Sequence, residues 1–383
     1  MRHVRGILAI LAPLVLAAAV AGPARACNVP VFRYALERWP PEAYTAYVFH
    51  RGPLTAEQQA VVKRLEPAGG GAGGGNIDLQ AVDVSADLKD EAAEVWKQHA
   101  SATLPLVVVR YPAAVSIPVD AWSGPLSDAS VSLILDSPAR RKVAKRILEG
   151  ECAVFVLLET GNRAEDDRLA GLVEAELKRL EKTLELPRPT AGGSWDDPVY
   201  DRQGAPDLRL ALSVLRLSRT DPAEAAFVQA LLGTERGLRE SAEPMVFAVF
   251  GRGRVLCALV GKGITPDNLE TVAEFVVGPC SCVVKSENPG VDLVMTVDWT
   301  AALAGEASAI PEVEPPALSG LSRFAEGGAA PAGQAAADPP RPTAVRAKSA
   351  VLLAAAAAAG GILIVAVVGL VIWRRGPPAR NSS

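Results

Sequence analysis

Two kinds of apolar pattern alternate along the first half of the chain. Short continuous runs are typical of buried strands, and longer segments with polar starts are typical of helices. Thr55-Ala56-Glu57-Gln58 is a capping box, and Ser137 followed by Pro138 begins another helix, which Gly150 ends. In chain order, this half predicts a strand at 44–49, a helix from 55, a strand at 77–84, a helix at 90–99, strands at 106–111 and 116–122, and a helix from 138.

The second half repeats this order. A cap at Asn162 precedes a long apolar stripe, Gly251-Arg252-Gly253-Arg254 is a hairpin turn, and Thr265 caps a helix that begins with proline. The pattern predicts a strand at 152–159, a helix from 162, a strand at 208–214, a helix from 221 to 233, strands at 245–250 and 255–260, and a helix from 265 to 278. Both halves therefore predict β-α-β-α-β-β-α, an α/β fold in two units, 27–150 and 151–303.

The start of the chain carries an export signal. Residues 1–26 combine Arg2 and Arg5 with an uncharged apolar run and the small residues Ala24-Arg25-Ala26, which predicts a cleaved secretory signal peptide. The alternatives are an uncleaved anchor helix, which the short apolar run disfavours, and a lipidated Cys27, which the preceding arginine disfavours.

The end of the chain carries an anchor. Residues 349–373 contain no charged side chain and are long enough to cross a lipid bilayer as one helix, with Trp373 and Arg374 at its cytoplasmic end. Residues 304–348, rich in proline, alanine and glycine, are predicted to be a linker. We expect a single-pass membrane protein with its ectodomain outside the cytoplasm and a cytoplasmic tail at 374–383.

Composition narrows the classes of function. Hydrophobic residues make up 49% and charged residues 21% of the 383 residues, a globular balance. The net charge of -4 leaves no basic excess for a phosphate backbone, so no nucleic acid partner is expected. The chain has only three histidines, His3, His50 and His99, and no familiar catalytic motif; we therefore expect no metal site, no cofactor and no catalytic residue, although the question of enzymatic activity stays open.

The order of elements resembles the thioredoxin fold, occurring twice over roughly residues 30 to 300. The resemblance implies a cis-proline before the third strand of each unit, where Pro105 and Pro244 stand; an ordinary trans proline is the alternative. Thioredoxin-like oxidoreductases carry Cys-x-x-Cys at the first helix, but the sequence there reads His50-Arg51-Gly52-Pro53 and Thr160-Gly161-Asn162-Arg163. The usual dithiol is therefore missing from both units.

Two segments resemble a family of uncharacterised exported proteins of planctomycete-type bacteria. They are the run from Cys27 to Trp39 and the segment Gly278-Pro279-Cys280-Ser281-Cys282. Because that family has no established activity, the resemblance implies a place in the bacterial envelope and an architecture, but no reaction.

The cysteines are the main candidates for chemistry. Cys152 and Cys257 fall within apolar strand patterns, where cysteine acts as a small hydrophobic residue. Cys27, Cys280 and Cys282 lie in turn-rich segments, and three interpretations compete for them. They are a structural disulfide from Cys27 to Cys280 or Cys282, a labile Cys280-Ser281-Cys282 redox pair, and soft-metal binding by two thiolates that no neighbouring histidine or methionine supports.

These patterns favour a membrane-anchored extracytoplasmic binding or scaffold protein with redox-inactive thioredoxin-like units. Its expected partners are the lipid bilayer, through the C-terminal helix, and an envelope protein of unknown identity. The alternative is a thiol-disulfide oxidoreductase or thiol sensor that uses Cys280 and Cys282.

Overall fold

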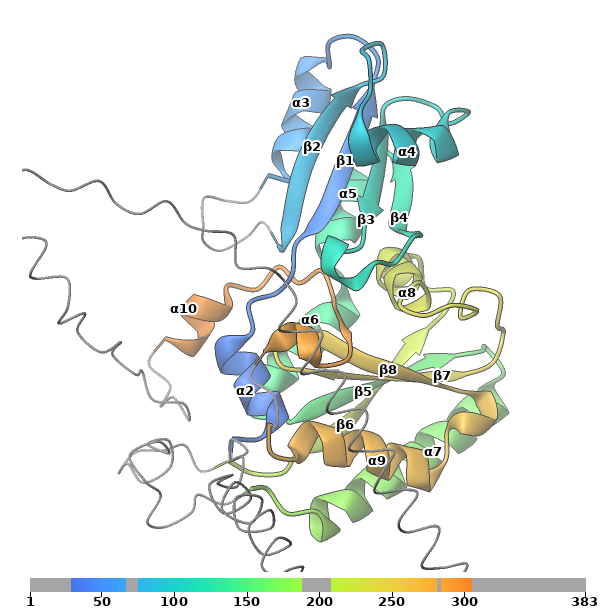
Figure 1. The fold of residues 1–383 in the computed structure, drawn as a ribbon. Helices are drawn as coiled ribbons and strands as arrows, with labels where there is room; N and C mark the ends of the chain where they lie inside the picture. Colours follow the sequence, from blue (N-terminus) through green and yellow to red (C-terminus); the bar gives the residue numbers. More distant parts are fainter. Residues whose placement is uncertain (1–28, 67–74, 188–207, 281–283, 305–383) are drawn as a thin grey trace, which may run out of the picture. The chain divides into compact units, whose positions relative to one another are not determined.

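The protein is a mixed α/β structure with one four-stranded and one five-stranded sheet (Figure 1). The computed structural model describes residues 29–66, 75–187, 208–280 and 284–304. The predicted signal peptide, membrane span, tail and all but the first residue of the linker lie outside these ranges. None of the described helices is both long and apolar enough to cross a membrane.

The first sheet is built from residues 44–125 and has the strand order β2-β1-β3-β4. Its strands and the helices near it are β1 (Tyr44–His50), α3 (Ala56–Lys63), β2 (Ile77–Asp83), α4 (Asp90–His99), β3 (Leu106–Arg110), η1 (Ala113–Val115), β4 (Asp120–Pro125) and α5 (Asp128–Leu135). Strands β1 and β2 are parallel, whereas β3 is antiparallel to both β1 and β4.

Helices cover both faces of the first sheet. Because side chains alternate along a strand, Ala46 and Val48 of β1 pack with α3 and α5, whereas Tyr47 and Phe49 pack with α4. Trp96 of α4 lies against Phe49, with ring centroids 5.3 Å apart. The sequence run 44–50 is apolar nearly throughout because both of its faces are buried.

The second sheet has the strand order β6-β5-β7-β8-β9. The remaining elements are α2 (Val31–Arg38), α6 (Pro138–Leu148), β5 (Ala153–Glu159), α7 (Arg163–Thr183), β6 (Leu212–Ser218), η2 (Pro222–Glu224), α8 (Ala225–Leu232), β7 (Met245–Phe250), β8 (Arg254–Val260), η3 (Gly261–Gly263), α9 (Pro266–Val277), η4 (Lys285–Glu287), β9 (Val291–Asp292) and α10 (Trp299–Leu303). Strands β5 and β6 are parallel, and the other neighbours are antiparallel.

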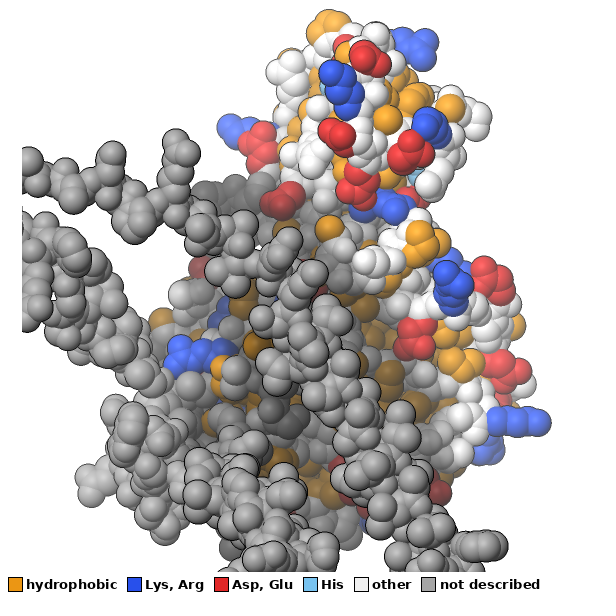
Figure 2. All heavy atoms as spheres, in the orientation of Figure 1, with side chains coloured by type: hydrophobic (Ala, Val, Ile, Leu, Met, Phe, Trp, Pro, Cys, Tyr) orange, Lys and Arg blue, Asp and Glu red, His pale blue; other side chains and the backbone are white. Residues whose placement is uncertain are grey.

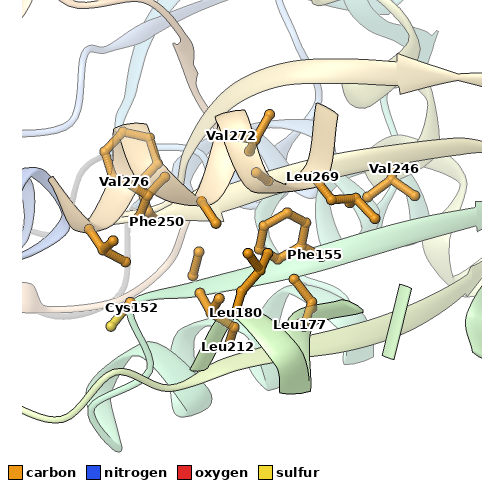
Figure 3. Close-up of a cluster of buried hydrophobic side chains, with 14 of the residues drawn as sticks. Cys152, Phe155, Leu177, Leu180, Leu212, Val246, Phe250, Leu269, Val272 and Val276 are labelled. Carbon is orange, nitrogen blue, oxygen red and sulfur yellow. The ribbon is translucent and has the colours of Figure 1, made fainter. Parts of the chain in front are cut away.

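The larger of the two cores on the second sheet lies under α7 and α9. Phe155 of β5 lies between Leu177 and Leu180 of α7 on one side and Leu269 and Val272 of α9 on the other (Figure 3). On the opposite face, β5 packs against α6 and α8. The alternation that splits β1 between two cores therefore also splits β5.

The first described helix of the chain belongs to the second sheet. Phe32 and Ala35 of α2 are part of the core under α9. The backbone N–H of Val31 donates to the carbonyl of Gly278 at 2.9 Å, and that of Cys280 donates to the carbonyl of Val29 at 2.9 Å. The first described segment therefore packs on the second sheet before the chain enters β1 of the first.

Several boundaries differ from those predicted. Helices α2 and α5 are additional to the predicted elements, because α2 has no side-chain cap and α5 is rich in serine and β-branched residues, which have low helix propensity. Strand β4 begins at Asp120 rather than at residue 116, since η1 and a left-handed Ser116 precede it. Strand β6 begins at Leu212 rather than at residue 208, since its partner β5 begins opposite that residue.

Candidate functional site

The end of β1, where the thioredoxin resemblance places a dithiol, is closed by internal hydrogen bonds. His50 Nδ1 donates to the carbonyl of Gly52 at 2.7 Å, within a turn that Gly52 makes at φ +67°. The carboxylate of Asp83 accepts from the backbone N–H groups of Ser85 at 2.9 Å and Gly52 at 3.3 Å. The Ser85 N–H is the main cause that lowers the pKa of Asp83. The loop thus holds an imidazole and a carboxylate in structural roles and offers no nucleophilic thiol.

Pro105 lies at the same edge of the sheet as His50. The register pairs Phe49 with Leu106, so the residue before β3 stands beside the end of β1. The Leu104–Pro105 peptide bond is cis, and the Pro105 carbonyl accepts from the N–H of Leu126 at 3.0 Å.

Pro244 occupies the matching position of the second sheet, beside the end of β5, but the prediction of a cis bond there is wrong. Within the described residues the only cis peptide bond is the one at Pro105. In the trans arrangement, the Glu243 carbonyl accepts from Arg219 Nη2 at 2.9 Å and the Pro244 carbonyl accepts from the N–H of Gly261 at 2.9 Å. The trans bond is also intrinsically favoured by about 0.5–1 kcal/mol.

The turn after β5 is closed by Asp166 from the first turn of α7. Its carboxylate is 2% exposed and accepts from the backbone N–H groups of Thr160 and Gly161, both at 2.9 Å. This buried carboxylate fills the turn, so the second unit too has a structural side chain at the position that the resemblance assigns to a dithiol.

The predicted cysteine site is described only in part. Cys27 and Cys282 lie outside the described residues. Cys280 is 1% exposed and belongs to the core under α9. Its backbone N–H donates a hydrogen bond to the carbonyl of Val29, so it lies next to the N-terminal segment. The structure therefore places the segment that follows Cys27 beside the segment that contains Cys280, without describing a cysteine pair.

Cys280 and Pro244 lie at opposite edges of the second sheet. Cys280 follows α9 beside α2, and Ala35 of α2 packs against Gly251, which directly follows the carboxyl end of β7. Pro244 precedes the amino end of the same strand. Cys280 is consequently remote from Pro244.

The other two described cysteines are Cys152, just before β5, and Cys257 in β8. Cys152 lies at the end of the core in Figure 3, and Cys257 of β8 is partly buried. Burial is the main cause that raises the pKa of Cys152 to about 12 and the pKa of Cys257 to about 11. Both thiols therefore stay protonated at neutral pH and are poor nucleophiles.

A charged cluster lies at the other edge of the first sheet, around Asp120 at the start of β4. Its Oδ2 accepts from His99 Nε2 at 2.8 Å and its Oδ1 from Arg110 Nη1 at 2.9 Å. The backbone carbonyl of Asp120 accepts from Arg239 Nη2, which comes from the segment after α8. Asp120 thus joins three side chains, His99, Arg110 and Arg239, and the third reaches it from the second half of the chain.

A pocket of about 330 Å³ opens beside this cluster. The apolar wall consists of Ile117, Pro118 and Val119 before β4, and Val119 is 38% exposed. The segment after α8 provides the opposite wall, including Arg236 and Arg239. The volume falls within the range of pockets that hold small ligands or parts of peptides.

Arg239 is held in place at this pocket. The hydroxyl of Tyr111 donates to the carbonyl of Ala230 at 2.5 Å and is also hydrogen-bonded to Arg239. Burial is the main cause that raises the pKa of Tyr111, so its hydroxyl stays neutral. A Cβ on Gly233 would lie 2.8 Å from Arg239 Nη2, so the guanidinium packs directly on the main chain.

Sequence reasoning did not find this pocket. Its walls come from residues 116–119 and 232–240, which read as a strand start and a turn. The signal available in the sequence was a short turn-rich segment with two glycines, Gly233 and Gly237, and two arginines, Arg236 and Arg239. Figure 2 shows acidic and basic side chains intermixed on the visible face, so local groups rather than a broad field set the chemistry there.

Comparison with known proteins assigns no family to the chain. No family model matches it, and no curated protein matches it either.

Proposed function

We propose that the chain is a membrane-anchored extracytoplasmic binding or scaffold protein built on two thioredoxin-like units without dithiol chemistry. The strand connectivity supports this interpretation. In β2-β1-β3-β4, a parallel pair formed across a helix is followed by an antiparallel hairpin, and β6-β5-β7-β8 repeats that arrangement before β9 is added. This order supports the resemblance to the thioredoxin fold in both units.

The observation that carries the proposal is the content of the two loops at the thioredoxin active-site position. The first loop is closed on itself by His50 and Gly52, and the second by Asp166 and Thr160. A dithiol exchange reaction requires an accessible thiolate as the attacking group, and neither loop contains a cysteine. A fold that keeps its framework but lacks this group is suited to binding.

The proposed location follows from the sequence of the two ends. A signal peptide at 1–26 would export the chain, and the apolar segment at 349–373 would anchor it in the bilayer. The intervening linker would hold the folded units away from the lipid, where an envelope protein can reach them.

Peptide mapping of the exported protein under non-reducing conditions tests the rival redox function. We expect a stable link from Cys27 to Cys280 or Cys282, because residues 29–31 pair with residues 278–280. An open Cys280–Cys282 dithiol with a mildly oxidising potential would instead establish the oxidoreductase or thiol sensor.

Copurification tests the binding function. The full chain and a chimera that keeps only residues 304–383 behind an unrelated ectodomain would be crosslinked in native membranes and solubilised in detergent. We expect an envelope protein with the full chain that the chimera does not retain. Recovery of no such protein, or of the same proteins with both, would overturn the binding proposal.

A further inference from the structure

The pocket beside Asp120 combines a fixed cation with an apolar wall. Arg239 is fixed by Tyr111 and by the Asp120 carbonyl, and it packs against Gly233. A guanidinium fixed in this way loses little conformational entropy when it binds an anion. The geometry therefore favours recognition of a planar anion, since the guanidinium fork matches a carboxylate.

The positive groups of the pocket are available for such an anion. Within the described part of the chain, neither Arg236 nor Arg239 forms an ion pair, and both are exposed. The carboxylate of Asp120, the residue whose main-chain carbonyl accepts from Arg239, is already occupied by His99 and Arg110. Two guanidinium groups thus face the pocket without a protein carboxylate as partner.

The apolar wall favours a ligand with a hydrophobic side chain next to its anion. Val119 is one of only two large hydrophobic residues that are exposed in the described ranges, and it lies beside Ile117 in the wall. Covering such a side chain gains about 25 cal/mol for each Å² of apolar surface removed from water. A purely polar anion would leave this contribution unused.

Two acidic side chains narrow the class of anion further. Glu235 and Glu240 also line the pocket, and Glu235 Oε1 accepts from the N–H of Ala258 at 2.8 Å. Their charge disfavours a phosphate dianion, and Glu240 can accept a hydrogen bond from an N–H donor on the ligand. The end of a peptide has the required groups: one carboxylate, an adjacent side chain and main-chain N–H donors.

We propose that this pocket binds the free carboxyl terminus of a polypeptide whose last residue is apolar. Arg239 and Arg236 receive the carboxylate, and Ile117 and Val119 cover the terminal side chain. This inference rests on the proposed binding function and names the part of the partner that would be recognised.

Binding of a short peptide that ends in leucine tests the inference. The peptide carries fluorescein at its amino end, and fluorescence anisotropy is measured with the full-length protein in detergent. We expect saturable binding that weakens at least tenfold when the terminal carboxylate is converted to an amide, a factor that corresponds to about 1.4 kcal/mol. A peptide that ends in aspartate should also bind at least tenfold more weakly.

N-acetyl-leucine as competitor distinguishes a peptide from a single amino acid, and we expect it to compete at least tenfold more weakly than the unlabelled peptide.

Two variants locate the site. Arg236→Ala and Val119→Ser each change an exposed side chain, so we expect both proteins to fold and to bind the peptide at least fivefold more weakly. Arg163→Ala removes a guanidinium that is 93% exposed on α7, outside the pocket, and should leave binding unchanged.

Equal binding of acid and amide peptides, wild-type affinity of both pocket variants, or absence of saturable binding would each overturn the inference. Copurification of an envelope protein that persists in these variants would show that the general binding function holds while this pocket is not its site. Loss of both peptide binding and copurification in these variants would show that the proposed binding function acts through this pocket.

Discussion

At the scale of single residues, Gly233 shows how closely side chains approach the main chain next to the candidate site. A Cβ at this position would lie 2.2 Å from the hydroxyl of Tyr111 and 2.8 Å from Arg239 Nη2. Both groups are held elsewhere, Tyr111 by Ala230 and Arg239 by Asp120. The absence of a side chain at residue 233 is therefore a packing requirement and not a matter of backbone flexibility.

We expect Gly233→Ala to lower the free energy of unfolding by about 1–3 kcal/mol, because the new methyl group must displace Tyr111 or Arg239. Urea unfolding followed by circular dichroism measures this change. Gly171→Ala in α7 is the matched control, since nothing lies within 4 Å of its Cβ position, and it should stabilise the protein by about 0.5–1 kcal/mol. Equal effects of the two substitutions would contradict the packing argument.

The thiol of Cys152 gives a pH dependence whose sign follows from burial. Its pKa is raised from 9.0 to about 12 in the folded protein, so above pH 9 the unfolded chain loses a proton that the folded chain keeps. Stability from this group is complete below pH 9 and is lost as the pH rises towards 12, with a slope of at most about 1.4 kcal/mol per pH unit.

Comparison of the wild type with Cys152→Ala between pH 8 and pH 11 isolates this contribution. We expect the unfolding free energy of the wild type to fall more steeply with pH than that of the variant, which is less stable at pH 8 because it leaves a cavity. The same slope in both proteins would show that the thiol ionises normally in the folded state.

At the scale of elements, Arg140 connects the end of α5 to the start of α6. Its side chain is buried and donates to the carbonyls of Ile134 at 2.7 Å, Leu133 at 2.5 Å and Val294 at 3.1 Å. The first two are carbonyls at the end of a helix, which have no partner within it. Burial is the main cause that lowers the pKa of Arg140, to about 10, so the group remains charged at neutral pH.

We expect Arg140→Lys to lower the free energy of unfolding by about 1.5–3 kcal/mol, because an ammonium group cannot span three carbonyls as the planar guanidinium does. Arg141→Lys, at the next position but 62% exposed in its side chain, should change it by less than about 0.5 kcal/mol. Thermal unfolding of both variants provides the measurement. An unchanged stability of Arg140→Lys would mean that these carbonyls find other donors.

Element boundaries were predictable where the signal is local. The helix starts at Thr55, Ser137, Asn162 and Thr265 were predicted, and each of these side chains accepts a hydrogen bond from the backbone of the first turn. Helix α5 also has a capping serine at Ser127, but its interior has low helix propensity, and the element is stabilised by packing of Val131 and Ile134. Packing partners far along the chain cannot be read from local patterns.

At the scale of the whole molecule, both sheets lie within one compact unit. The core of the first sheet includes Ala226 of α8 and Val294, which follow the second sheet's first strands in sequence. The N-terminal helix α2, in turn, contributes Phe32 to the core of the second sheet. Because each core contains side chains from segments that neighbour the other sheet in the sequence, we expect the two sheets to unfold together.

Phe32→Ala tests this coupling. Phe32 is 4% exposed, so truncation should lower the free energy of unfolding by about 3–5 kcal/mol. We expect the transitions followed by circular dichroism and by tryptophan fluorescence to coincide in the variant as in the wild type. Val284→Ala, which changes a residue that is 51% exposed, should have little effect. Two separate transitions would show that the sheets unfold independently.

The amino-acid sequence by itself determined the α/β class, most strands, the capped helix starts and the absence of cysteine from the loops that follow β1 and β5, because these depend on neighbouring residues. Only the tertiary structure decided that α2 covers the second sheet, that the bond before Pro244 is trans, that Cys280 is buried, and that Asp120 meets Arg239. Each of these depends on contacts between segments distant in the chain, whose formation is governed by burial and hydrogen bonding of the folded whole and leaves no local pattern.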